Sequence, residues 1–426
     1  MRVRLLLSLL LFTLIVAGCI HPDASQDSAQ PGQFAFMVTG DTVEKAVYED
    51  LVAAFHQKHP EISTEVVYIP DAGNYRKRLS ADIAAGIPAE VVLLNYRRIA
   101  AYAAKDGFEA LDPYLAQSEL IHKDDFYPQV MDAFQWQGAQ QCIPQNISSP
   151  VVFYNKKIFD DAGIAYPLDS WTWDEFATTA QALTQDTNGD GKSDIYGVGS
   201  EASIIRMAPF VWMAGGELFD NNAQPTKLTL DTVEAKAALQ WFVDLQVKYQ
   251  AAPDAINEES ENSESRFLNG RLAMFLDSRR VVPTFRTISD FDWDVAALPT
   301  GKQSASVLHS DGFCITKASK GKDAAWKFIE FATSVEGQTI LAKTGRTVPS
   351  LKSVAQSSAY LEPNAKPANS KVWLDVIPGI RPLPVLATWP DIESALNNEL
   401  TLAFMGGQSV DTAVETAQNK VQEFLK

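Results

Sequence analysis

Short apolar runs alternate with amphipathic stretches over the first quarter of the chain. The segments 34–38 and 91–94 are almost continuously apolar, and 62–69 alternates between apolar and polar residues. Both patterns are typical of β-strands. Between them, 43–55 and 75–83 place apolar residues at helical spacing. The resulting strand–helix–strand–helix–strand order predicts a parallel sheet with helices on both faces.

Polar residues follow the predicted strands at the sheet edge where a ligand is expected. Asp41, three residues before Glu44, has the spacing of a capping box at the start of a helix. In open α/β sheets, ligands bind beyond the carboxyl ends of the parallel strands. This topology places residues 40–42 and 95–97 at the rim of a ligand site.

The rest of the chain carries the same two signals, without an internal sequence repeat. Helical spacing predicts further helices over 174–183, 231–245, 323–333, 391–405 and 410–424. The chain has 426 residues, 46% of them hydrophobic, which is enough for large buried cores. This length predicts two or three domains.

The first 18 residues have the pattern of a secretory signal peptide. Two arginines precede an apolar run that is too short to span a bilayer comfortably. The sequence Val-Ala-Gly-Cys ending at Cys19 is a lipobox, which predicts cleavage before Cys19 and lipid attachment to its thiol. An uncleaved N-terminal anchor is the alternative. Residues 19–33 have too few apolar side chains to pack, and we expect a flexible tether.

Charge and cysteine content narrow the classes of partner. The formal net charge of −17 argues against nucleic acid or an anionic membrane surface and fits a soluble exported protein. Besides Cys19, only Cys142 and Cys314 are present. They could pair in an oxidising compartment or remain buried free thiols. We find no metal-binding cysteine or histidine pattern and no catalytic motif, so no cofactor is required by the sequence.

A proline-flanked, polar-tipped segment at 142–157 separates strand-rich from helix-rich sequence, as expected of a crossing between domains. Its continuation, over 154–176, resembles the Y-N-K-x-x-F, G-I and T-W-x-E-F signature of extracellular solute-binding proteins of ABC importers, in particular the carbohydrate-type family. Further stretches resemble motifs of the same family: 107–114, 213–219, 266–274 and 293–301. In this order and spacing, the resemblance extends over nearly the whole mature chain.

This resemblance implies an α/β, two-lobe periplasmic-binding-protein fold with three hinge crossings and discontinuous domains. We expect an N-terminal lobe of residues 34–147 plus 309–346 and a C-terminal lobe of 148–308 plus 347–426. The second and third crossings are expected at 306–316 and 345–349. Such a protein would be a non-enzymatic monomer that captures a mono- or oligosaccharide by hinge closure and delivers it to ABC permease subunits.

A sugar site combines carboxylates, amides, arginines and aromatic rings. The candidates near the expected rims and crossings are Asp41, Tyr96, Ser148, Trp212, Asp277, Arg280, Asp311, Gly312 and Trp389. For both tryptophans a place in the core is an equal alternative. Where relatives often carry a G-x-W platform, this chain has Asp277 to Arg280. We expect Arg280 to act as a fork donor to an acidic group and Arg279 to lie on the surface.

Three alternatives to a sugar importer component remain open. The same fold could bind an anionic solute such as a glycerol phosphodiester, which Arg97, Arg279, Arg280 and Arg346 would favour. Asp277 and Asp311 argue against an anion if they face the cleft. The second alternative is an exported glycosidase, and the third is a sensory module that reports its ligand to a receptor.

The segment 186–194 resembles the first three-quarters of an EF-hand calcium loop, with oxygen side chains at positions 1, 3, 5 and 9 and glycine at position 6. Position 12 is Gly197 instead of glutamate, so a structural calcium would need a carboxylate from elsewhere. The alternative is a turn whose side chains cap its own backbone. The candidate ligands are Asp186, Asn188, Asp190, Lys192 and Asp194.

Overall fold

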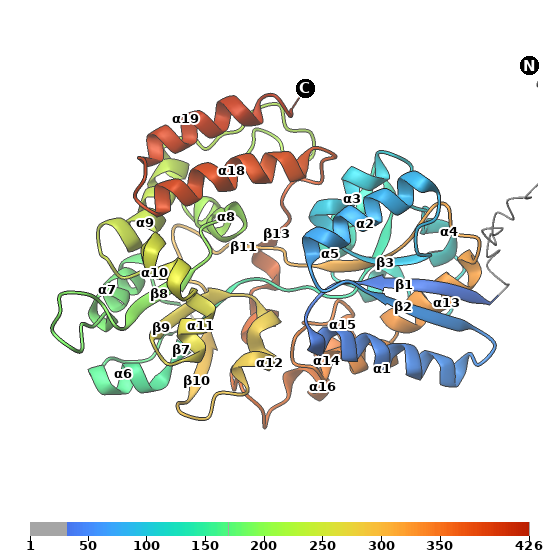
Figure 1. Cartoon of the computed structure of the whole chain (residues 1–426), viewed down its shortest axis with the longest axis horizontal. Helices are drawn as coiled ribbons and strands as arrows, with labels where there is room; N and C mark the ends of the chain where they lie inside the picture. The colour runs from blue at the N-terminus through green and yellow to red at the C-terminus, as the bar shows by residue number, and fades with distance from the viewer. Residues whose placement is uncertain (1–31, 169, 426) are drawn as a thin grey trace, which may run out of the picture.

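The apolar runs predicted as strands form the centre of the first of two α/β lobes in the computed structural model (Figure 1). The structure describes residues 32–168 and 170–425. The expected signal peptide, the lipidation site at Cys19 and almost all of the expected tether lie outside the described residues. The two-lobe α/β fold class predicted from the sequence is confirmed.

The sheet of the first lobe has the order β2-β1-β3-β12-β6. The strands β1, β2 and β3 are parallel, as the strand–helix alternation predicts. β12 enters between β3 and β6 and is antiparallel to both, because it returns from the other lobe. The bounds are β1 Gln33–Val38, β2 Ser63–Tyr68, β3 Val91–Asn95, β6 Cys142–Pro144 and β12 Asp311–Ile315, with a small hairpin of β4 Gln135–Trp136 and β5 Ala139–Gln140.

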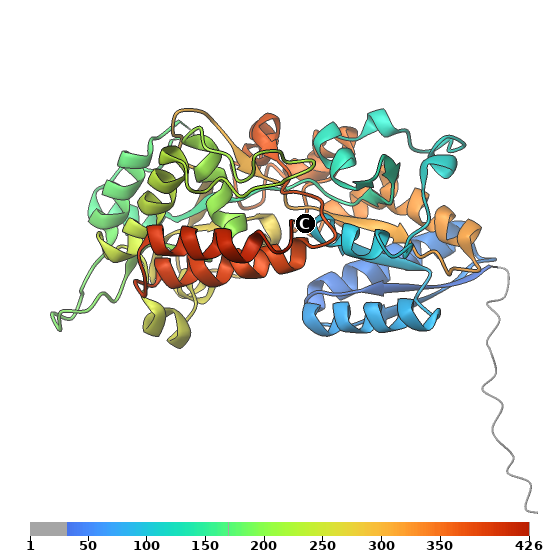
Figure 2. The ribbon, with the colours of Figure 1, turned by 90° about the horizontal axis from the view of Figure 1, so that it is seen from above.

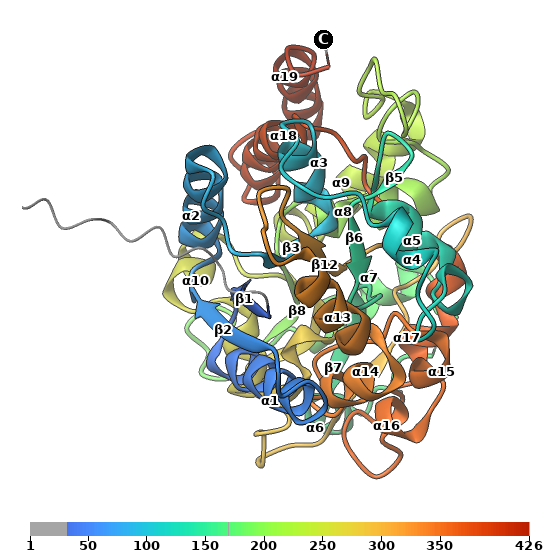
Figure 3. The same ribbon diagram turned by 90° about the vertical axis from the view of Figure 1, so that its right-hand side faces the viewer.

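Helices cover both faces of this sheet, with α1, α13 and α14 on one side and α2 and α3 on the other (Figure 3). The capping box predicted at the start of α1 is confirmed: Asp41 accepts from the backbone N–H of Glu44, and Glu44 accepts from that of Asp41. The bounds are α1 Thr42–Lys58, α2 Ala72–Ala85, α3 Tyr96–Ala103, α4 Asp112–Leu115, η1 Lys123–Asp125, α5 Pro128–Ala133, α13 Lys322–Thr333, α14 Val335–Ala342, α15 Lys352–Ala355 and α16 Ser358–Leu361.

The second lobe is built on a four-stranded sheet of order β10-β7-β9-β8, in which only β8 and β9 are parallel. Its strands are β7 Val151–Asn155, β8 Tyr196–Ser200, β9 Leu272–Asp277 and β10 Trp293–Ala296. Its helices are α6 Lys156–Ala162, α7 Trp173–Leu183, α8 Ile204–Met213, α9 Val233–Val247, α10 Ala255–Ser260, α11 Ser263–Leu268, η2 Arg279–Val281, α12 Val282–Phe285, α17 Val372–Asp375, η3 Ile377–Gly379, α18 Trp389–Phe404 and α19 Val410–Val421.

Three segments join the lobes, and the third differs from the expectation. The chain passes from β6 to β7 and returns through β11 (Ser306–Val307), which pairs with β13 (Ile380–Arg381) between the lobes (Figure 1). The third crossing was expected at 345–349, but the chain does not leave the first lobe there. Leu351 still bridges to Phe126, and α15 and α16 contact α14, so the chain leaves the first lobe only beyond α16.

Cys142 and Cys314 form a disulfide. They face each other in register on the antiparallel neighbours β6 and β12. The sequence left open whether these cysteines pair, and the structure shows that they do. The bond joins two parts of the first lobe between which, along the chain, all strands of the second-lobe sheet lie. Among the described residues, no helix combines the length and apolarity needed to cross a membrane.

Candidate functional site

A cavity of about 260 Å³ lies between the two lobes, and we call it the interlobe cavity. The first lobe contributes α1, the end of β3 and the start of β12, while the second contributes the start of α8 and η2. The lining is almost wholly polar and comprises Glu44, Tyr48, Asn95, Arg97, Gln145, Asn146, Ser148, Glu201, Ile205, Arg206, Ser278, Arg280, His309, Ser310, Asp311, Arg346 and Thr347.

The first lobe presents hydrogen-bond acceptors to this cavity. Asp311 opens β12 opposite Asn95 at the end of β3 and accepts from the Asn95 side chain at 3.1 Å. Its own N–H donates to Asn146 Oδ1 at 2.8 Å, which fixes the residue. The second carboxylate oxygen of Asp311 has no hydrogen-bond partner among the described residues. Burial raises the pKa of Asp311, although Asn95, Arg97 and Arg346 act against that rise.

Glu44 adds a second carboxylate to the first-lobe side of the cavity, and we call Asp311 and Glu44 together the acceptor wall. One carboxylate oxygen accepts from the Asp41 N–H at 3.1 Å, and the other lies 2.8 Å from Arg346 Nε. Burial raises the pKa of Glu44; Arg346 opposes this rise, and the nearby Asp311 adds to it. The capping residue of α1 is therefore also a cavity residue.

The second lobe presents donors held by one buried carboxylate. Asp277, only 2% exposed, accepts from Arg206 Nη2 at 2.7 Å and from Arg280 Nη2 at 2.5 Å. Burial acts to raise the pKa of Asp277, but the two arginines outweigh it and hold the pKa below its ordinary value. Arg280 also donates to Glu264 at 2.8 Å. Asp277 thus fixes two guanidinium groups that line the cavity.

Two crossing residues complete the lining. The backbones of Ser148 and His309 bond to each other in both directions, at 2.9 and 2.8 Å. Burial, followed by repulsion from Arg206, Arg97 and Arg280, lowers the pKa of His309 well below its ordinary value, so its ring is neutral at neutral pH. Ser148 Oγ is buried and has no partner among the described residues, which leaves a hydroxyl available to a ligand.

Each of the four arginines that line the cavity has a carboxylate partner. The pairs are Arg97 with Glu393, Arg206 with Asp277, Arg280 with Asp277 and Glu264, and Arg346 with Asp41 and Glu44. The positive charge of the lining is therefore compensated by the protein itself. This arrangement suits a ligand that both donates and accepts hydrogen bonds more than one that carries a large net charge.

The structure brings some of the predicted site residues together. Ser148, Arg280 and Asp311 line the interlobe cavity. Asp277 lies behind it and holds Arg280, and Asp41 accepts from Arg346 at 2.9 Å at the cavity edge. Their roles in ligand binding stay predictions.

The other four predicted residues do not reach this cavity. Trp212 and Trp389 are 1% and 0% exposed and belong to the core, which is the alternative that the sequence left open. Tyr96 is fully buried at the start of α3. Gly312 is required by packing, because an added Cβ would lie 2.7 Å from the Phe134 ring.

Arg279 corrects the expectation of a surface residue. Its side chain is 0% exposed and lies between two rings, 4.4 Å from the centroid of Tyr360 and 4.9 Å from that of Trp373. The sequence signal was ambiguous, because consecutive side chains in a 3₁₀ turn lie a third of a turn apart and the sequence does not show which of them faces the core. Arg280 faces the cavity, whereas Arg279 faces the core.

Sequence reasoning missed Glu44 and Arg206 as cavity residues. Glu44 already had an explanation as half of a capping box. Arg206 is a lone charge within the otherwise apolar run 204–213, and the whole of α8 is buried. A buried charge needs a partner, so this isolated arginine was the available signal.

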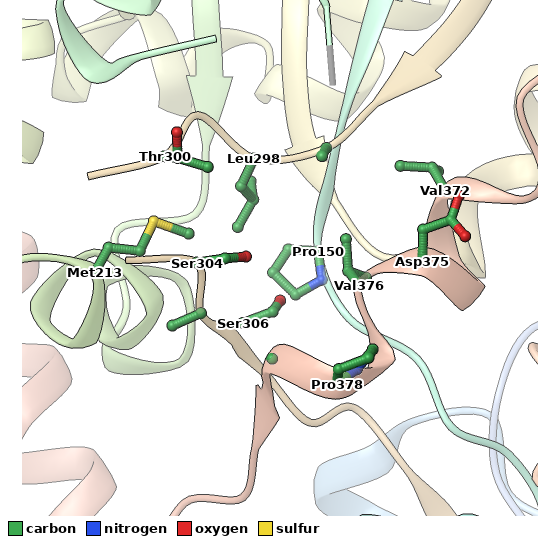
Figure 4. A pocket seen from close by; sticks show the side chains of 13 residues that line it. Pro150, Met213, Leu298, Thr300, Ser304, Ser306, Val372, Asp375, Val376 and Pro378 are labelled. Carbon is green, nitrogen blue, oxygen red and sulfur yellow. The ribbon is translucent and has the colours of Figure 1, made fainter. Parts of the chain in front are cut away.

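A larger hollow of about 480 Å³ lies at the second lobe and is not the better candidate. Figure 4 shows Pro150, Leu298 and Val376 around it, from three segments of the chain. None of its lining residues comes from the first-lobe sheet. A solute bound there would not bridge the lobes, whereas the interlobe cavity takes polar groups from both.

The EF-hand-like loop uses its oxygen atoms locally. Asp186 accepts from the N–H groups of Gly189 and Gly191, and Asp194 accepts from that of Thr187. Asn188 and Asp190 each accept from the backbone N–H two residues later, the second from Lys192. These hydrogen bonds are the ones expected if the segment is a turn whose side chains cap its own backbone, which was the alternative to a calcium loop. Within the described residues, no group of three acidic, histidine or cysteine side chains is arranged to hold a metal.

Gly197, at the missing twelfth position, lies in β8, where an added Cβ would be 1.7 Å from the Ala180 carbonyl oxygen. Calcium binding by the loop stays a prediction. If the loop binds calcium, calcium chloride should raise the melting temperature of the purified protein, because a ligand that binds only the folded state stabilises it. A chelator should reverse this rise. Replacing Asp190 by alanine should abolish that response, and a response that persists in this variant would point to another site.

Comparison with known proteins agrees with the geometry. The bacterial extracellular solute-binding protein family matches residues 39–339. The mannitol-binding protein of Pseudomonas aeruginosa is 25% identical, over 97% of each chain. The sn-glycerol-3-phosphate-binding periplasmic protein of Escherichia coli is 23% identical, over 89% of this chain and 90% of its own.

Among solved structures, an ABC substrate-binding protein of Listeria monocytogenes in complex with cycloalternan superposes with a TM-score of 0.85. It is 23% identical, and the match covers 92% of this chain and 98% of that one. At this identity the likeness establishes the fold, while the family match covers well over half of the chain. The chain belongs to the bacterial extracellular solute-binding proteins.

Proposed function

We propose that the protein captures a neutral, polyhydroxylated solute of about one sugar ring, a monosaccharide or a polyol, and delivers it to the permease of an ABC importer. The observation that carries this proposal is the interlobe cavity, whose polar lining comes from both lobes. A solute that contacts both lobes favours the closed form in proportion to its additional contacts there.

Charge and shape favour this solute class over the alternatives. A glycerol phosphodiester would add negative charge beside Glu44 and Asp311, and the lining arginines already have carboxylate partners. Tyr48 is the single phenylalanine, tyrosine or tryptophan of the lining, so the cavity lacks the stacked platforms that suit oligosaccharides. The likeness to a mannitol-binding protein supports a small polyol.

As a member of an extracellular family, the protein works outside the cytoplasm. The proposal includes cleavage before Cys19 and a lipid anchor on its thiol, supported by the lipobox. Mass analysis of the mature N-terminus checks this part. An unmodified Cys19, or a chain that retains residues 1–18, would contradict it.

A thermal-shift screen tests the ligand. We expect D-mannitol and neutral hexoses to raise the melting temperature, because a ligand at 100 times its dissociation constant adds about 2.7 kcal/mol to the free energy of unfolding. Glycerol 3-phosphate and sugar acids should add less. A larger shift with glycerol 3-phosphate would contradict the neutral solute. Reducing ends released from an oligosaccharide would identify a glycosidase instead.

A further inference from the structure

One edge of the interlobe cavity carries a cluster of three charged side chains, of which the sequence pointed only to Arg97. Arg97 and Arg98, in the first turn of α3, both donate to the carboxylate of Glu393 on α18. Glu393 is only 4% exposed. Figures 1 and 2 show the C-terminal helices extending from the second lobe toward α3, and α3 and α18 are in contact. The cluster therefore joins the two lobes directly.

We propose that Arg97, Arg98 and Glu393 form an interlobe clamp that closes this edge of the cleft and limits the captured solute to a single sugar ring. The inference rests on the proposed function and adds to it the residues that set the size of the solute. The clamp residues are distinct from the acceptor wall, and Arg98 and Glu393 do not line the cavity.

The clamp depends on the separation of the lobes. Because α3 belongs to the first lobe and α18 to the second, a hinge opening that moves each lobe as a unit separates the partners. An ion pair exposed to water contributes little to stability. In the closed form, by contrast, Glu393 is buried and neutralises two guanidinium groups. Removing Glu393 would leave both guanidinium groups without their carboxylate partner. The clamp therefore favours the closed form.

Contacts between the lobes at two edges of the cavity explain a limit on the size of the solute. Arg97 lines the cavity and is held by Glu393, so a second sugar ring that left the cavity between α3 and α18 would have to displace this pair. At another edge, Arg346 donates to the backbone carbonyl of Arg280 across the lobes at 3.1 Å. The cavity volume of about 260 Å³ is smaller than the roughly 300–1,000 Å³ of clefts that hold drug-sized ligands.

The test uses Arg98→Met and Glu393→Gln, with Glu415→Gln on the exposed face of α19 as the matched control. Small-angle scattering of the ligand-free protein should show a larger radius of gyration for the two clamp variants and no change for the control. D-Mannitol should bind about tenfold more weakly to each clamp variant, because the apparent affinity falls with the population of the closed form. The preference for D-mannitol over maltose should also fall.

A role in stability alone would lower the melting temperature of the variants but leave the radius of gyration and the mannitol-to-maltose preference unchanged, and that result would overturn the clamp. Arg98→Lys, which keeps the charge and loses the fork, replaces Arg98→Met if the latter does not fold. If wild-type protein binds neither probe, the proposed solute class fails. The scattering comparison, which needs no ligand, then still decides whether the clamp exists.

Discussion

Replacing Asp311 by asparagine is expected to weaken binding of the captured solute about 100-fold and to leave the fold intact. Hydrogen bonds to a charged group are each worth about 1.5–3 kcal/mol. The free carboxylate oxygen of Asp311 can accept from one or two ligand hydroxyls at the base of the interlobe cavity. Losing about 3 kcal/mol corresponds to about a 100-fold rise in the dissociation constant. Isothermal titration with the solute found by the thermal-shift screen measures this change.

The asparagine variant is chosen because it preserves the surroundings of residue 311. Its side-chain oxygen can still accept from Asn95, and its N–H can still donate to Asn146. The fold should therefore persist, as a melting temperature within a few degrees of wild type would show. Asp50→Asn on the exposed face of α1 is the matched control and should bind normally.

The pH dependence gives a second readout of the same carboxylate. Because burial raises the pKa of Asp311, its acceptor oxygens become protonated at a higher pH than those of an ordinary aspartate. Affinity should therefore fall as the pH decreases through this raised pKa. Glu44 has a raised pKa as well and contributes to the same loss. The variant should show a smaller pH dependence than wild type, and an unchanged profile with unchanged affinity would rule out the role of Asp311.

Local signals along the sequence were sufficient for most of the fold. The parallel strands β1 to β3 and the capping box of α1 follow from the spacing of apolar residues and from two side chains, Asp41 and Glu44. The third crossing could not be placed this way. The residues after Gly345 contact the first lobe through Leu351 and two short helices, and such contacts depend on distant segments that periodicity does not report.

The site was harder to predict than the fold because burial decides the role of each residue. Asp311 and Ser148 were found since they lie in crossings, where backbone from both lobes meets. Trp212 and Trp389 have suitable chemistry for sugar binding but lie in the core. The sequence also offered no means to see that Asp277 holds Arg206, 71 residues away along the chain. Pairing across such a distance requires the tertiary structure.

Arg279 is a fully buried residue whose removal we expect to destabilise the protein strongly. Its guanidinium donates to Ser370 Oγ at 3.2 Å and lies 3.5 Å from Glu362, in addition to its place between the rings of Tyr360 and Trp373. Of the residues around it, Tyr360 lies in α16, and Glu362, Ser370 and Trp373 lie in the chain that returns to the second lobe after α16. Arg279 therefore connects this returning segment to the end of β9.

Arg279→Ala is expected to lower the free energy of unfolding by about 3–5 kcal/mol, the range for truncating a large buried side chain to alanine. Each cation–π contact contributes about 2 kcal/mol when it is desolvated, and truncation also leaves a cavity between two rings. Arg279→Lys should recover only part of this loss, because an ammonium group keeps the charge but lacks the planar surface that stacks on both rings. Urea denaturation measures both variants.

The neighbouring arginine provides the internal control for this prediction. Arg280 is 45% exposed at its side chain and lines the cavity, so Arg280→Ala should weaken solute binding but lower the free energy of unfolding less than Arg279→Ala, because Asp277 keeps its bond to Arg206. Substitution of one arginine would then mainly reduce solute binding, and substitution of its neighbour would mainly reduce stability. A loss below about 1 kcal/mol in Arg279→Ala would contradict the prediction, because a surface position is where substitutions have such small effects. It would mean that the returning segment is held in place without the stacked guanidinium.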